Sequence, residues 1–200
     1  AICAAALQAG GEESAQFARR LYSRLSDKDL AAAPVEQRAA AAISLLGFAR
    51  RRLPGVAKVR ILNPSLADHG FESRHTIVQI VNDDMPFLVD SIANEFNRRE
   101  IAVHLLAHPV MAARRDLDGD LVGIALEAGE RARSESMMHI EIDRQTDPVL
   151  IDEIAAKGDY VSGKGKESKE DVFDDYVARL AADVESGKPL TVGWDAGNGS

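Results

Sequence analysis

The sequence HTIVQIVNDDMPFLVDSI, residues 75–92, joins a strand-like segment to a helix-like segment. Residues 76–81 are mostly β-branched and apolar, which is typical of a strand in the middle of a sheet that is covered on both faces. Pro86 suits the first turn of a helix, because the amide hydrogen that proline lacks has no helical partner there. From Leu88 to Phe96, apolar residues recur at helical spacing. The stretch therefore predicts a buried strand that leads directly into an amphipathic helix over residues 86–99.

The residues on either side predict the other elements. Before this stretch we expect two helices, a short strand and a polar loop, over residues 12–30, 34–53, 58–62 and 65–74. After it we expect a long strand, the hairpin turn LDGD, a returning strand, an alternating strand and a helix, over residues 101–116, 117–120, 121–127, 136–144 and 147–156. This order predicts an α+β, ferredoxin-like sandwich, with helices on one side of an antiparallel sheet.

The alternating strand SMMHIEIDR predicts how the sheet is covered. Its apolar residues are expected to pack on the helix that starts near Pro86, against Leu88, Ile92 and Phe96; they are Met138, Ile140 and Ile142. The alternate residues are polar and are expected to face water; they are His139, Glu141 and Asp143. One face of the sheet should therefore be buried and the other solvated.

Composition excludes several classes of partner. With 24 basic and 32 acidic residues the net charge is −8, so we expect no binding to nucleic acid or to an anionic membrane. No apolar run approaches the ~20 residues that span a bilayer. The single cysteine, Cys3, fits a reducing compartment, and we expect a cytoplasmic location. Residue 1 is not expected to be the native start, because the chain begins within an apolar, helix-like segment without methionine.

Changes in composition and in residue pattern along the sequence divide it into three segments. We expect an N-terminal helical segment over residues 1–55, an α+β domain over 56–156 and a separate segment over 157–200. The last begins with the glycine- and lysine-rich stretch KGDYVSGKGKESKE and continues as one amphipathic helix and one strand. A single helix and a single strand cannot complete a core, so this segment is expected to be loosely attached across a seam between residues 146 and 157.

Four stretches carry a resemblance to a known family: VRILNP, HTIVQIVNDDMPFLVDSI, HLLAHPV and HIEIDR, in that order. Over residues 15–150 the chain resembles the N-terminal region of the large, bacterial-type NAD-specific glutamate dehydrogenase. The resemblance implies an ACT-like regulatory and assembly region of an enzyme that deaminates glutamate oxidatively to 2-oxoglutarate. It implies NAD for the full-length enzyme, with the nicotinamide site and catalytic lysines far downstream. We therefore expect no catalytic residue and no cofactor site in this chain, and as partners the rest of the dehydrogenase chain and further copies of it.

The C-terminal segment has a different resemblance. GDYVSGKGK, DVFDDYVARLAADV and KPLTVGWDAGNGS are similar to a segment of phosphomannomutases and phosphoglucomutases. The alternative interpretation is therefore a fragment of a hexose-phosphate mutase. The phosphoserine, metal, sugar and phosphate loops of that family do not occur in this sequence. The dehydrogenase-like part is also about three times longer, which favours the dehydrogenase.

The turn between the buried strand and its helix is the candidate ligand site. ACT modules usually hold an amino acid near such a turn, which here implies Asn82, Asp83, Asp84, Met85 and Phe87. Free amides at a helix N-terminus attract a carboxylate, and either aspartate could receive an ammonium group. The ACT turn usually carries glycine where Phe87 stands, and a phenyl group would crowd the ligand. The alternative is that Asp83 or Asp84 only caps the helix.

Three other motifs have structural interpretations. The arginines of RRRLPG, residues 50–55, are expected at a helix C-terminus, where they offset the helix dipole; an anion-binding patch is the alternative. His104 and His108 on one strand would lie about 13 Å apart, too far for one metal ion. DLDGDL, residues 116–121, is expected to be a tight turn rather than a metal loop. We therefore expect no metal site.

Overall fold

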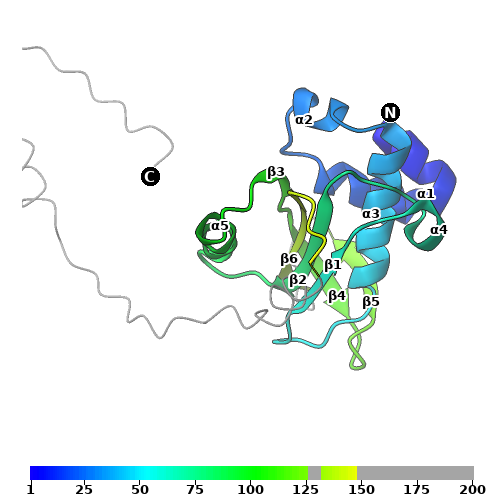
Figure 1. Ribbon diagram of the computed structural model, residues 1–200. Helices are drawn as coiled ribbons and strands as arrows, with labels where there is room; N and C mark the ends of the chain where they lie inside the picture. Colours follow the sequence, from blue (N-terminus) through cyan, green and yellow to red (C-terminus); the bar gives the residue numbers. More distant parts are fainter. Residues whose placement is uncertain (126–131, 148–200) are drawn as a thin grey trace, which may run out of the picture. The chain divides into compact units, whose positions relative to one another are not determined.

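The computed structural model describes residues 1–125 and 132–147 of the 200-residue chain (Figure 1). Its elements, in chain order, are α1 (Ile2–Leu21), α2 (Asp27–Ala31), α3 (Val35–Ala49), β1 (Lys58–Leu62), α4 (Leu66–His69), β2 (Thr76–Asp83), α5 (Leu88–Arg98), β3 (Val103–Ala107), β4 (Val110–Arg115), β5 (Leu121–Ala125) and β6 (Arg133–Ile142). Within these residues, no helix is both long enough and apolar enough to cross a membrane. The predicted helix from residue 147, the predicted seam and the segment 157–200 fall outside the described residues or at their edge.

The sheet is built on a split βαβ unit. Strands β2 and β3 are connected through α5, and both pair antiparallel with β6, which lies between them. Strand β1 pairs with the outer side of β2, and β5 pairs with β4 at the opposite edge. The α+β, ferredoxin-like class predicted from the order of elements is confirmed.

Strands β3 and β4 behave as one long strand with a break. From Leu105 onward both strands pair with β6 in one continuous register, as the pairs Ala107 with His139 and Val110 with Ser136 show; the register shifts only between Val103 and Leu105. Across the break, the amide of Met137 donates to the carbonyl of Pro109 at 3.2 Å. The predicted long strand is therefore confirmed in register, and its pairing pattern is interrupted at Pro109, which has no amide hydrogen to donate.

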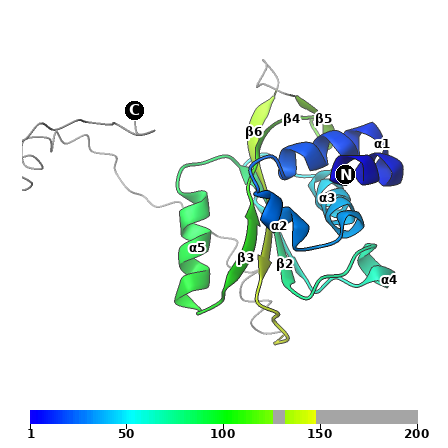
Figure 2. The same cartoon turned by 90° about the horizontal axis from the view of Figure 1, so that it is seen from above.

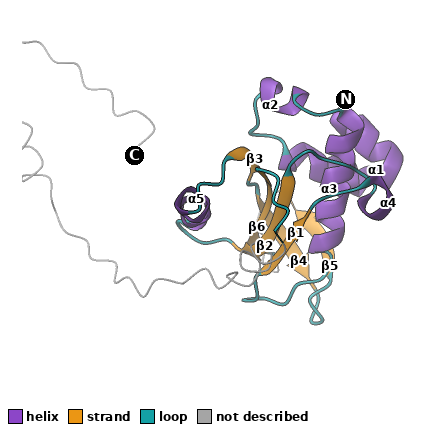
Figure 3. Ribbon diagram, viewed as in Figure 1, coloured by secondary structure: helices purple, strands orange, loops and turns teal. Residues whose placement is uncertain are grey.

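Helices cover both faces of the sheet (Figures 2 and 3). Helix α5 packs on one face through the predicted apolar stripe; this cluster contains Val78, Ile80, Leu88, Ile92, Phe96, Met138, Ile140 and Ile142. The other face carries a second core that includes Val81 and Met137 and is covered by α1 and α3. The prediction of helices on one side is therefore wrong.

The polar face of β6 is correspondingly buried. His139 has no exposed surface and Glu141 is 9% exposed, although both were predicted to face water. The reason is that their partners are polar groups: Gln79 lies 3.4 Å from the His139 ring, and Glu141 pairs with Arg38 of α3. A polar strand face can be covered when the covering helices supply hydrogen bonds and opposite charge. Thr76 to Val81, by contrast, are fully buried as predicted.

Helix boundaries differ from prediction where caps intervene. The helix predicted over residues 12–30 ends at Leu21, and α2 starts separately, with the Ser26 hydroxyl accepting from the amide of Asp29 at 3.2 Å. Helix α3 ends at Ala49 rather than near residue 53. The loop predicted over 65–74 contains the one-turn helix α4, capped by Ser65.

The predicted turn after β4 is confirmed. The carboxylate of Asp116 accepts from the amides of Asp118 and Asp120, at 3.0 and 2.8 Å. Gly119 has a φ of 83°, and a Cβ at that position would lie 2.6 Å from the carbonyl oxygen of Arg52. Only glycine fits this contact, so the turn brings the hairpin directly against the end of α3.

Candidate functional site

The predicted capping role of the two aspartates at the β2–α5 turn is wrong. Helix α5 begins at Leu88, after Pro86, and its N-cap position is held by Phe87, which has a φ of 62° and provides no side-chain cap. Asp83 is the last residue of β2, and Asp84 follows it. Both carboxylates instead have partners on other elements of the fold.

Asp83 belongs to a buried ion network at this end of the sheet. Its carboxylate accepts from Arg52, and from the amide of Gly55 at 2.8 Å. Burial alone would raise the pKa of Asp83, but the guanidinium of Arg52 outweighs it and the pKa is lowered. The side chain of Arg52 has no exposed surface. Asp83 is therefore an ionised internal partner of a buried arginine.

The network continues through Glu135 on β6. Arg52 donates to Glu135 at 2.8 Å, and Arg115 donates to both oxygens of the same carboxylate, at 2.7 and 2.8 Å. Burial alone would raise the pKa of Glu135, but these hydrogen bonds hold it below its usual range. Two arginines and two carboxylates thus balance each other beside the turn.

Arg115 of this network and the nearby Lys58 form hydrogen bonds with the C-terminal end of helix α3. Arg115 donates to the carbonyl of Ala49 at 2.9 Å, and the ammonium group of Lys58 donates to the carbonyl of Phe48 at 2.7 Å. These two residues lie outside the helix and satisfy two of its last carbonyls. Arg50 instead pairs with Glu13 of α1. Arg50 is the C-cap residue of α3 and Arg51 and Arg52 follow it, so the motif lies at the predicted helix C-terminus, although Arg52 is directed into the fold.

Hydrogen bonds connect Asp84 through Ser136 to His108, which lies at the break between β3 and β4. The hydroxyl of Ser136 donates to Asp84 at 2.8 Å, and the Nε2 atom of His108 lies 2.9 Å from the same hydroxyl oxygen. Because the proton of Ser136 is directed to Asp84, His108 must donate from Nε2. Burial lowers the pKa of His108, so a neutral ring with its proton on Nε2 fits this position.

The five residues predicted to bind a ligand are therefore divided between the interior and the surface. Asn82 is buried, and Asp83 and Asp84 have internal partners. Met85 and Phe87 are 40% and 77% exposed. The turn presents to solvent a phenyl group, a thioether, the carboxylate of Asp84 and the uncapped first turn of α5, whereas Asp83 is partly buried.

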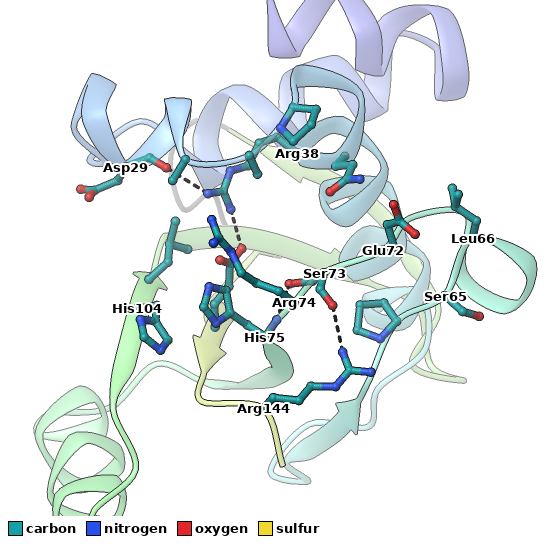
Figure 4. A pocket seen from close by; sticks show the side chains of 17 residues that line it. Asp29, Arg38, Ser65, Leu66, Glu72, Ser73, Arg74, His75, His104 and Arg144 are labelled. Atoms are coloured by element: carbon teal, nitrogen blue, oxygen red, sulfur yellow. Dashed lines mark hydrogen bonds and ion pairs between the residues drawn. The ribbon is translucent and has the colours of Figure 1, made fainter. Parts of the chain in front are cut away.

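A second site lies under the N-terminal helices, and sequence reasoning missed it. A cavity of about 840 Å³ opens between α2, α3, the loop before β2 and the end of β6 (Figure 4). Arg38 on its wall pairs with Glu141 and donates to the carbonyl of Asp29 at 2.9 Å. Burial alone would raise the pKa of Glu141, but the hydrogen bond with His139 and the charge of Arg38 lower it to about 2. Arg38 is separated from Glu141 by 103 residues, so no local motif indicates this site.

Histidines at the rim of this cavity make no metal site. His104 lies 2.7 Å from a carboxylate oxygen of Asp143, and its ring stacks on that of His75 with centroids 4.2 Å apart. His108 belongs to the separate chain with Ser136. Over residues 1–125 and 132–147, no group of three or more histidine, cysteine, aspartate or glutamate side chains is placed to hold a metal ion.

The split βαβ sheet, with a helix following its first central strand, defines an ACT-like domain of the ferredoxin-like class. The model of the family described as "Glutamate dehydrogenase, ACT1 domain" matches residues 17–157, which is more than half of the chain. The chain belongs to this family.

Two curated relatives agree with this assignment. The NAD-specific glutamate dehydrogenase of Halomonas elongata is 37% identical over 142 residues, which are 70% of this chain and 9% of the relative. That of Pseudomonas aeruginosa is 34% identical over 130 residues, which are 64% of this chain and 8% of the relative. The chain therefore spans less than a tenth of the length of these relatives. No solved structure gives a significant match, and these comparisons do not support the phosphohexomutase alternative.

Proposed function

We propose that this chain is a regulatory and assembly region of an NAD-dependent glutamate dehydrogenase. In the full-length enzyme, oxidative deamination of glutamate to 2-oxoglutarate with NAD would take place in another part of a much longer chain. The observation that carries the proposal is the match of residues 17–157 to the ACT1 domain of glutamate dehydrogenase. The names and lengths of the two NAD-specific relatives support it. The partners would be the remainder of the same chain and further copies of it in the cytoplasm.

We further propose that an amino-acid effector binds at the β2–α5 turn. The first-turn amides of α5 have no side-chain cap, so they remain available to a carboxylate. Asp84 is exposed near the start of this helix, with one oxygen accepting from Ser136, and can accept from an ammonium group. Phe87 is exposed, and it can turn away from or cover a ligand without disturbing the core.

The test uses the full-length enzyme that contains this region. The rate of NAD reduction with glutamate is measured with and without each of the protein amino acids, for the unchanged enzyme and for Asp84→Asn. In the unchanged enzyme, at least one amino acid should raise or lower the rate. In Asp84→Asn the same amino acid should have no effect. Glu95→Gln, on the outer surface of the same helix, is the control and should retain the response.

Two outcomes would contradict the proposal. One is an enzyme whose rate no amino acid alters and whose number of subunits, determined by light scattering, is unaffected by removal of residues 1–147. The other is glutamate-dependent NAD reduction by the isolated 200-residue chain, because that would place catalysis within it.

A further inference from the structure

The cavity under α2 and α3 is lined by three arginines from separate segments. Arg38 comes from α3, Arg74 from the loop before β2, and Arg144 from the residues after β6 (Figure 4). These positions are brought together only by the fold, since the first and last are more than 100 residues apart. The volume of about 840 Å³ falls within the range of small-molecule sites.

The guanidinium of Arg38 has an unsatisfied donor. Its side chain is 2% exposed, and its two terminal nitrogens donate to Glu141 and to the carbonyl of Asp29. The Nε atom is buried and has no hydrogen-bond partner. A buried polar atom without a partner, beside a cavity, is the kind of group that a bound ligand or an ordered water completes.

Arg74 and Arg144 have guanidinium N–H groups that are not used in hydrogen bonds with described residues. Among the described residues, the guanidinium of Arg74 makes no hydrogen bond or ion pair. Arg144 uses one terminal nitrogen, which donates to the carbonyl of Ser73 at 2.8 Å. Both side chains are exposed, so their charge faces the open part of the cavity rather than the core.

Most carboxylates of the lining already have partners. Glu141 is held by Arg38, and an oxygen of Asp29 accepts from the hydroxyl of Ser26 at 2.7 Å. Glu72 lies on the side of the cavity next to α4 (Figure 4). The unmatched hydrogen-bonding capacity of the cavity therefore consists mainly of guanidinium donors. These donors, in a planar fork, match the oxygens of carboxylates and phosphates.

We propose that this cavity binds a small anion that carries carboxylate or phosphate groups, held between Arg74 and Arg144, with Arg38 as its fixed inner wall. The site is separate from the β2–α5 turn and does not rest on the regulatory function proposed above. Two sources share this chemistry, a free dicarboxylate and a phosphate, and they are distinguished by using succinate and inorganic phosphate as separate probes.

Binding is measured on the 200-residue chain by titration calorimetry at low salt, and by the amide NMR shifts of residues 72–75. At least one probe should bind with millimolar or tighter affinity, and Arg74→Gln or Arg144→Gln should each weaken it about tenfold or more. Both arginines are exposed, so neither substitution should unfold the chain, which thermal melts can verify. Arg51→Gln, an exposed arginine outside the cavity, is the matched control and should leave the affinity within about twofold.

A response to succinate alone or to phosphate alone would support the site and identify its ligand class. Absence of binding by both probes would overturn the proposal. Binding that Arg51→Gln weakens as much as Arg74→Gln and Arg144→Gln would overturn it too, because the anion would then respond only to net charge.

Discussion

Replacing Glu141 by glutamine is expected to lower the free energy of unfolding by about 3 kcal/mol at pH 7. The side chain of Glu141 is 12% exposed and pairs with Arg38. Burial alone would raise its pKa, but His139 and Arg38 lower it from the ordinary value of 4.5 to about 2. Each pKa unit corresponds to about 1.4 kcal/mol, so a shift of this size corresponds to about 3 kcal/mol.

The pH dependence gives the sharper test. Because the pKa is lower in the folded state than in the unfolded state, the contribution is present above the unfolded pKa and is lost as pH falls toward 2. Urea unfolding of the unchanged chain and of Glu141→Gln, followed by circular dichroism, should differ by about 3 kcal/mol at pH 7 and by about half of that at pH 3.

Glu95→Gln is the matched control. The hydrogen bonds from Arg98 and Arg99 also lower the pKa of Glu95 to about 2, but Glu95 is 28% exposed and both pairs are formed within α5, by residues three and four apart. Ion pairs exposed to solvent contribute about 0–1 kcal/mol, so this variant should lose less than about 1 kcal/mol. Equal losses in the two variants, or a loss in Glu141→Gln that is the same at pH 3 and pH 7, would refute the reasoning.

Four further substitutions, one of them a control, test other parts of the fold by urea unfolding. Phe87→Gly should stabilise the chain by about 1 kcal/mol, because Phe87 is exposed and has a φ of 62°; a loss of stability would show that the phenyl group packs on something. Glu135→Gln should cost about 3–5 kcal/mol, since it removes the carboxylate shared by two buried arginines, and a cost below 1 kcal/mol would contradict the network. Ile140→Ala should cost about 2–5 kcal/mol, whereas the exposed Val122→Ala should change stability by less than about 0.5 kcal/mol; similar values for both would contradict the assigned burial.

The β2–α5–β6 unit could be predicted because the sequence patterns that indicate each of its elements are local. The apolar run of β2 and the helical spacing from Leu88 to Phe96 each depend on neighbouring residues alone. The alternation in β6 then identifies the residues that meet α5, and the predicted contact of Met138, Ile140 and Ile142 with that helix is confirmed. Turn chemistry also predicted the hairpin at residues 117–120.

The covering of the second face was not predictable by the same means. A polar residue in an alternating strand looks the same in the sequence whether it meets water or a buried partner. Glu141 is buried because Arg38 neutralises it, and nothing near either residue in the sequence indicates the other. The acidic residues of the turn were misassigned for the same reason. Asp83 follows a strand and precedes a helix, which suggests a cap, but Arg52 binds it from 31 residues away.

The antiparallel pairing of β2 with β6 also affects the order in which the chain can fold during synthesis. Thr76 pairs with Ile142, so 66 residues must be added after the start of β2 before its central partner is complete. At ribosomal rates of 5–20 residues per second this takes about 3–13 s. During that interval β2, buried on both faces in the finished domain, can pair only with β1. A nascent chain is therefore most exposed to aggregation or chaperone capture between the emergence of β2 and that of β6.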